Sequence, residues 1–290
     1  MIRIVVVSIL WLIAASTVAQ TRAPPGPQAD LSAVPTEVLI DQLATLDEET
    51  AGVAASGVYE TFMAEDGEPQ FTMGLIPAQR VTIPPQMREL VRRGGTALPA
   101  LVSHIRDQRP TRIVVGDGFL VMRAFSSEYD PRSNLAFRSS GCLSKCPEFD
   151  SYTVAIGDIC EVLIGQIVNR RMTAVRYQPT AILFVNSPIM TPELAQRIEA
   201  DWKGVDSKGL EASLLNDIVT SIDAADQFPP ETDKRIIASA NAARTQYRHQ
   251  GALKRLRFYY PQTYATLDGK LLTEREIFEK AEHDEGQTQP

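Results

Sequence analysis

The chain is poor in the residues on which most enzyme chemistry depends. Its 290 residues include three cysteines, three histidines and two tryptophans. Because imidazole is the usual side-chain base near neutral pH, so few histidines restrict acid–base catalysis. The sequence also lacks a G-x-S-x-G elbow, an H-E-x-x-H zinc helix and a glycine-rich phosphate loop. Serine hydrolase, zinc protease and nucleotide chemistry are therefore disfavoured, and we expect neither a metal nor a cofactor.

Long apolar runs are also missing, except at the N-terminus. There, Arg3 precedes the uncharged run 4–15, which is followed by Thr17-Val18-Ala19. A basic start, an apolar stretch and small residues before the cleavage site are typical of a secretory signal peptide. The run is shorter than the roughly 20 residues of a membrane-spanning helix. We therefore expect cleavage near Ala19 and export to the periplasm or the medium.

Charge of one sign is absent from two parts of the chain. Residues 23–79 contain ten acidic residues and no Lys or Arg, whereas residues 234–257 contain seven basic residues and no acid. After removal of Arg3 with the signal peptide, the chain has 28 basic and 36 acidic residues. This net negative charge disfavours a nucleic-acid partner. The two regions either lie within one fold as complementary or solvated faces, or one of them is a partner surface.

The distribution of prolines and apolar residues gives the domain organisation. Residues 20–34 are rich in proline and small residues, which predicts a flexible tether after the signal peptide 1–19. A single helical domain is expected over 35–283, with a subdivision near 110–150 as an alternative, and 284–290 as a disordered tail. This length is sufficient for a substantial core.

Apolar side chains recur at helical spacing through most of this domain. In residues 84–107, two short amphipathic stripes flank Gly94-Gly95, which predicts an αα-hairpin with a glycine turn. Residues 152–171 are apolar nearly all round, as expected of a helix at the centre of a core. We prefer one continuous helix there; the alternative is a strand over 152–156 and a helix capped by Asp158. Further helices are predicted at 35–47, from 191, and at 207–223, 231–249 and 250–258.

Two short stretches have the composition of β-structure. Residues 113–115 and 119–122 flank Gly116-Asp117-Gly118, which predicts a hairpin, and residues 181–185 form an extended run. The fold class expected is therefore mainly α, with helical hairpins around a central apolar helix and minor β-hairpins. An α+β fold is the alternative.

The hairpin at 84–107 resembles one HEAT-type repeat, although no second copy follows at a fixed period. Residues 84–223 as a whole resemble a family of uncharacterised exported bacterial proteins. The resemblance rests on this hairpin, an Arg-Pro-Thr turn, the segment GDICEVLIGQIVNR and a later RYQPT. It implies a helical fold and export, and it brings no activity with it.

If a disulfide forms in an oxidising compartment, it uses two of the three cysteines and the third has no cysteine partner. Cys142 and Cys146 are close enough in sequence to close a small ring, so we predict a structural disulfide between them. Cys160 lies on the apolar face of the central helix and is expected to be buried and reduced. A redox-active Cys142–Cys146 pair is a weaker alternative, because the spacing differs from the CxxC arrangement that lowers a thiol pKa.

Arginines beside proline-stiffened turns are candidates for holding a carboxylate, from a ligand or from the protein itself. They are Arg109, before Pro110, and Arg176 with Tyr177, before Pro179. The basic segment, with Arg248 and Arg255, is a candidate for contact with an acidic partner or with anionic lipid headgroups.

These observations favour a non-catalytic interaction or scaffold protein of the bacterial envelope, with a protein partner and an undefined oligomeric state. Peripheral contact with an anionic membrane is compatible with the basic segment. The alternatives are an envelope hydrolase that uses a carboxylate pair and a thiol redox protein. Whether the chain is an enzyme stays open at this point, with the balance against it.

Overall fold

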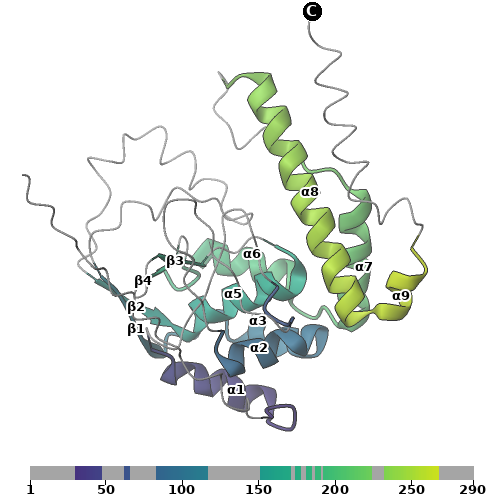
Figure 1. The fold of residues 1–290 in the computed structure, drawn as a ribbon. Coiled ribbons are helices and arrows are strands. Elements are labelled where there is room, and N and C mark those ends of the chain that lie inside the picture. Colours follow the sequence, from purple (N-terminus) through teal and green to yellow (C-terminus); the bar gives the residue numbers. More distant parts are fainter. Residues whose placement is uncertain are drawn as a thin grey trace, which may run out of the picture. The chain divides into compact units, whose positions relative to one another are not determined.

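The structure, a computed structural model, describes residues 30–47, 62–65, 83–116, 151–170, 174–177, 181–184, 187–190, 192–223 and 232–267. Its described part is mainly helical with minor antiparallel β-structure, which confirms the expected fold class (Figure 1). The predicted signal peptide 1–19, Cys142, Cys146 and the predicted tail 284–290 lie outside the described residues. None of the described helices combines the length and apolarity needed to cross a bilayer.

The N-terminal helices pack directly on the core. Helix α1 (Thr36–Gln42) continues into a 3₁₀ turn, η1 (Leu43–Thr45), and its side chains Leu39, Ile40 and Leu43 are fully buried. Helix α2 (Pro85–Arg92), the 3₁₀ turn η2 (Gly94–Thr96) and α3 (Leu98–Ser103) follow. The predicted break at Gly94-Gly95 is confirmed. Gly94 has φ +53°, a conformation that side chains other than glycine rarely adopt.

The central apolar segment begins with a strand. Strand β2 (Ser151–Ala155) leads directly into helix α5 (Ile156–Val168), so the preferred continuous helix was wrong and the alternative with a cap is confirmed. The physical reason is the cap itself: Asp158 Oδ2 accepts a hydrogen bond from the Ala155 amide at 2.8 Å. Almost every residue of α5 is buried, as expected for a central helix.

The described β-strands form two antiparallel pairs. Strand β1 (Pro110–Gly116) pairs antiparallel with β2, with Pro110 opposite Ala155 and Gly116 opposite Ser151. The partner described for β1 is thus distant in sequence, and the expected partner at 119–122 lies outside the described residues. Strands β3 (Ala174–Tyr177) and β4 (Ala181–Phe184) form a second antiparallel pair, which confirms the extended run predicted at 181–185 for its residues 181–184.

The C-terminal helices are α6 (Pro192–Trp202), α7 (Ser207–Val219), α8 (Lys234–Tyr259) and α9 (Pro261–Ala265). Helix α8 is one helix of 26 residues, so the predicted division at 249–250 was wrong. Gly251 does not interrupt it, because packing compensates for the low helix propensity of glycine. Helices α7 and α9 both pack on α8 (Figure 1).

Candidate functional site

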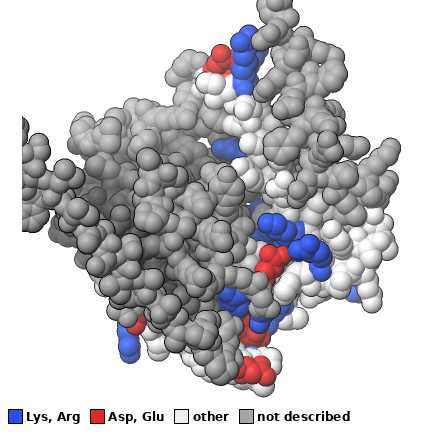
Figure 2. Space-filling model, in the orientation of Figure 1, with Lys and Arg blue, Asp and Glu red and all other residues white. Residues whose placement is uncertain are grey.

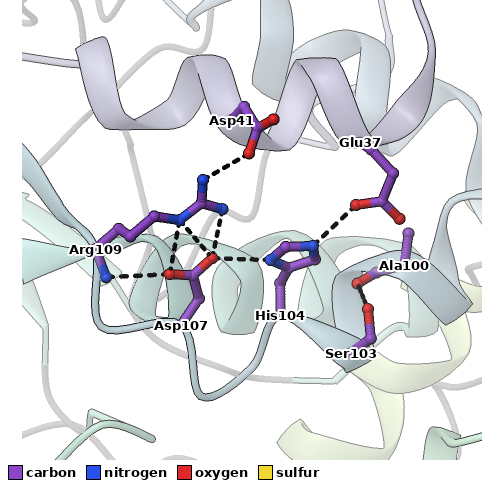
Figure 3. A network of polar contacts seen from close by, with 7 residues as sticks. All are labelled: Glu37, Asp41, Ala100, Ser103, His104, Asp107 and Arg109. Atoms are coloured by element: carbon purple, nitrogen blue, oxygen red, sulfur yellow. Dashed lines mark hydrogen bonds and ion pairs between the residues drawn. The ribbon is translucent and has the colours of Figure 1, made fainter.

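A polar network joins α1 to the turn after α3 (Figure 3). His104, at the end of α3, places Nδ1 2.8 Å from Asp107 Oδ2 and Nε2 2.9 Å from Glu37 Oε2. Arg109 donates to Asp107 Oδ2 and to Asp41 Oδ1, each at 2.6 Å. Glu37 and Asp41 are one turn apart on α1, so their carboxylates reach the two cations together.

Both cations in this network are held by carboxylates, which shifts the protonation equilibria. Burial lowers the pKa of His104, but hydrogen bonds to Asp107 and Glu37 outweigh it and raise the pKa above its ordinary value. Burial opposes ionisation of Asp107 as well. Hydrogen bonds from Arg109 and His104 overcome that cost and lower the pKa of Asp107 to about 2. The network is therefore most stable with a protonated imidazole between two carboxylates.

This geometry favours a structural role for the network, joining α1 to the turn after α3, over a catalytic one. In a hydrolase triad, one ring nitrogen of the histidine faces a nucleophile, whereas both nitrogens of His104 already face carboxylates. The neighbouring hydroxyl of Ser103 donates to the carbonyl of Ala100 at 2.7 Å (Figure 3). Arg109 binds carboxylates of its own chain, which is one of the two uses that the sequence suggested for it.

The network predicts a pH-dependent stability. Because the folded pKa of His104 is above its ordinary 6.5, its contribution is complete below about pH 6.5 and is lost as pH rises through the folded value. We expect His104→Gln to be destabilising near pH 5 and the gap to the wild type to shrink as pH rises. Urea unfolding of both proteins between about pH 5 and about pH 9 measures the gap.

Asp107 sets the acid limit of the same window. Its folded pKa of about 2 is below the ordinary 3.8, so its contribution to stability is present above about pH 4 and is lost as pH falls toward 2.

The prediction for His104 would be contradicted if the difference in unfolding free energy between wild type and His104→Gln stayed constant between about pH 5 and about pH 9.

A second anchor holds the chain just before α1. Arg93 donates to the carbonyl oxygens of Leu31 at 2.9 Å and of Val34 at 2.6 Å, and to the hydroxyl of Thr36 at 3.0 Å. Its Nε donates to Glu89, one turn away on α2. No local pattern predicts this role of Arg93, because its acceptors are mostly backbone carbonyls at sequence separations of 59 to 62.

Arg255 of α8 lies in the interior. It is 3% exposed, donates to the carbonyl oxygen of Gln166 at 2.6 Å and to Asn169 Oδ1 at 3.0 Å, and stacks over the ring of Phe62. The expected surface role of Arg255 is therefore corrected: burial makes it a residue of the core. The carbonyl of Arg248 joins the same cluster by accepting from Asn169 Nδ2 at 2.7 Å.

The cluster around Asn169 connects α8 to the end of α5. Asn169 has φ 59° at the C-terminal cap of α5 and donates to Asp217 Oδ2 at 3.0 Å. Arg170 reaches the same oxygen at 2.6 Å, so a buried carboxylate of α7 binds two donors. Helices α5, α7 and α8 thus share one buried polar junction, which fixes which face of α8 turns inward.

The opposite face of α8 carries exposed apolar side chains. Ile236 is 57% exposed, Tyr247 41% and Phe258 39%. These residues are spaced by eleven, and eleven residues make about three helical turns, so they lie on one line along the helix. The inward face carries the buried His249, Ala252 and Leu256. Helix α8 therefore has an inner face that builds the fold and an outer face, defined by the exposed parts of Ile236, Tyr247 and Phe258. The ring of Phe258 also packs edge-on against Phe62, with 5.4 Å between the ring centroids, so this residue lies where the outer face meets the core.

Exposed basic side chains occur along α8, and one of them, Lys254, lies on the line of the outer face. Lys234, Arg235, Lys254 and Arg257 are exposed. Arg257 approaches Glu65, from the acidic part of the chain, at 3.3 Å. On the side shown in Figure 2, basic and acidic side chains of the described residues lie next to one another. The two charged regions of the sequence thus meet in places, while α8 keeps exposed cations.

The remaining predicted site residues are placed as follows. Arg176 and Tyr177 lie on β3, opposite Ile182 and Ala181 of β4. Cys160 is buried on α5, as predicted, and burial raises the pKa of its thiol. Because Cys142 and Cys146 lie outside the described residues, their disulfide stays a prediction.

Comparisons with protein families, with curated proteins and with solved structures give no match to this chain. Interpretation of its function therefore depends on the geometry above.

Proposed function

We propose that the protein is an exported, non-catalytic interaction or scaffold protein of the bacterial envelope, which binds a partner through the outer face of α8. The observation that carries this proposal is the line of Ile236, Tyr247 and Phe258, which are 57%, 41% and 39% exposed on one face of a helix that is anchored on the other. Large apolar side chains aligned in this way are characteristic of binding surfaces.

The rest of the described structure supports a rigid platform for this face. The C-terminal end of α8 is fixed by Tyr259, whose hydroxyl donates to the carbonyl of Val91, and by Tyr260, which donates to Ser207 O at 2.6 Å. The polar groups around His104 and Arg255 are used in joining elements of the chain. Pre-organisation of this kind reduces the entropy that a binding surface loses when its partner docks.

In-cell photo-crosslinking tests the proposal. A benzoylphenylalanine in place of Tyr247 is expected to form a protein adduct in the envelope fraction. The matched control places the same crosslinker at Gln196, which is exposed on α6. An equal adduct yield at both positions, or no adduct at position 247, would argue against binding through α8.

A further inference from the structure

The shape of the outer face indicates what kind of partner fits it. Ile236 and Phe258 are 22 positions apart, which at 1.5 Å per residue places them about 33 Å apart along α8. Between Ile236 and Tyr247, the positions on the same line are Ala240 and Ala243. Small residues allow a second helix to approach to the usual interaxial distance of about 8–10 Å. The part of the face between Ile236 and Tyr247 is therefore lined by small side chains.

The charge of α8 indicates what that partner carries. Four basic residues of α8 are exposed, namely Lys234, Arg235, Lys254 and Arg257, and residues 234–257 contain no acidic residue. Lys254 is exposed, seven positions after Tyr247 and four before Phe258, so it lies on the same line. A second copy of α8 would bring like charges together, which disfavours self-association through this face. Acidic side chains on a partner would instead complement the exposed cations.

A lipid surface fits this face less well than a helix does. Helices that lie on membranes have a broad apolar face rich in Trp, Phe or Leu. The outer face of α8 has three large apolar side chains over about 33 Å, with alanines between the first two. Alanine adds little transfer free energy, but it leaves room for another backbone.

We infer that the outer face of α8 binds an acidic amphipathic helix of another protein, laid along the line of Ile236, Tyr247 and Phe258. This inference rests on the proposed function and adds the chemistry of the partner to it. Apolar side chains of the bound helix fill the spaces above Ala240 and Ala243. Its acidic side chains flank Lys254 and the other exposed cations of α8.

A peptide selection tests the inference on the mature chain. The library displays helical peptides of about 24 residues, long enough to span the face. Flanking positions are drawn equally from Glu and Lys, and inward positions from Ala, Leu, Ile and Phe. We expect selected peptides to be enriched in Glu and to bind more weakly at high salt. Tyr247→Glu and Lys254→Glu should each weaken binding about tenfold or more, and Gln196→Glu should not.

Three outcomes would overturn the inference: equal enrichment of Lys and Glu, binding that Tyr247→Glu leaves unchanged, or no selected peptide at all. Binding of the chain to phosphatidylglycerol vesicles without peptide selection would assign the face to lipid and would also overturn it. If crosslinking at position 247 succeeds while the selection fails, the proposed function stands and the acidic helix is wrong. If both fail, both are wrong.

Discussion

Replacement of Arg255 by Ala is expected to lower the free energy of unfolding by about 3–5 kcal/mol, because it leaves buried acceptors without a donor, at about 1–3 kcal/mol each, and removes a large buried side chain. The guanidinium of Arg255 donates to Gln166 O, Asn169 Oδ1 and Gly251 O. Without it, these buried acceptors lose their donor and a cavity opens beside Phe62. Chemical denaturation of the purified chain measures the loss.

The chain offers a close control for this prediction. Arg257 is two positions further along α8, is 63% exposed at its side chain and makes an ion pair of 3.3 Å with Glu65. Arg257→Ala should change the unfolding free energy by no more than about 0.5 kcal/mol, as is usual for exposed pairs. Equal effects of the two substitutions would mean that Arg255 is not buried and that α8 is rotated relative to our description.

The second large effect is expected at Gly157, in the first turn of α5. A Cβ atom there would lie 2.6 Å from the carbonyl oxygen of Ile105, which is backbone and cannot move aside cheaply. The Gly157 amide also donates to Asp107 O at 2.9 Å. Gly157→Ala should therefore push α5 away from the turn that carries His104 and Asp107. We expect a loss of about 1–3 kcal/mol, as for overpacked cores.

Gly209 in α7 is the matched control for this substitution. Its Cβ would meet a methyl group of Val205 at 3.0 Å, a contact with a side chain instead of backbone. Because alanine is the better helix former, Gly209→Ala should be close to neutral or slightly stabilising. Thermal unfolding of both variants separates the two cases. A neutral Gly157→Ala would show that α5 does not pack closely on the turn after α3.

Much of the fold follows from local patterns in the sequence. The glycine break in 84–107 and the apolar central helix were predictable because each depends on residues within a few turns. The start of α5 was misjudged because Asp158 could serve either within a helix or as its cap. The pairing of β1 with β2 joins residues about 40 positions apart, which no local pattern specifies.

The candidate site was predictable only in part. His104 and Asp107 are only three positions apart, so a local turn suffices to bring them together, whereas Glu37 is 67 positions from His104 and enters through tertiary packing. Arg255 was expected at the surface because the sequence shows that the helix is basic but does not show which of its faces packs on the core. The line of Ile236, Tyr247 and Phe258 had a signal that went unused, namely their spacing of eleven residues.

The central claim is that the outer face of α8 serves a partner while the inner face maintains the fold. The most direct measurement places the crosslinker at Ile236 and compares the chain with and without Tyr247→Glu, in parallel with its unfolding midpoint. Our account predicts that the adduct is lost and that the midpoint falls far less than in Arg255→Ala. An adduct that persists, or a midpoint that falls as far as in Arg255→Ala, would contradict it.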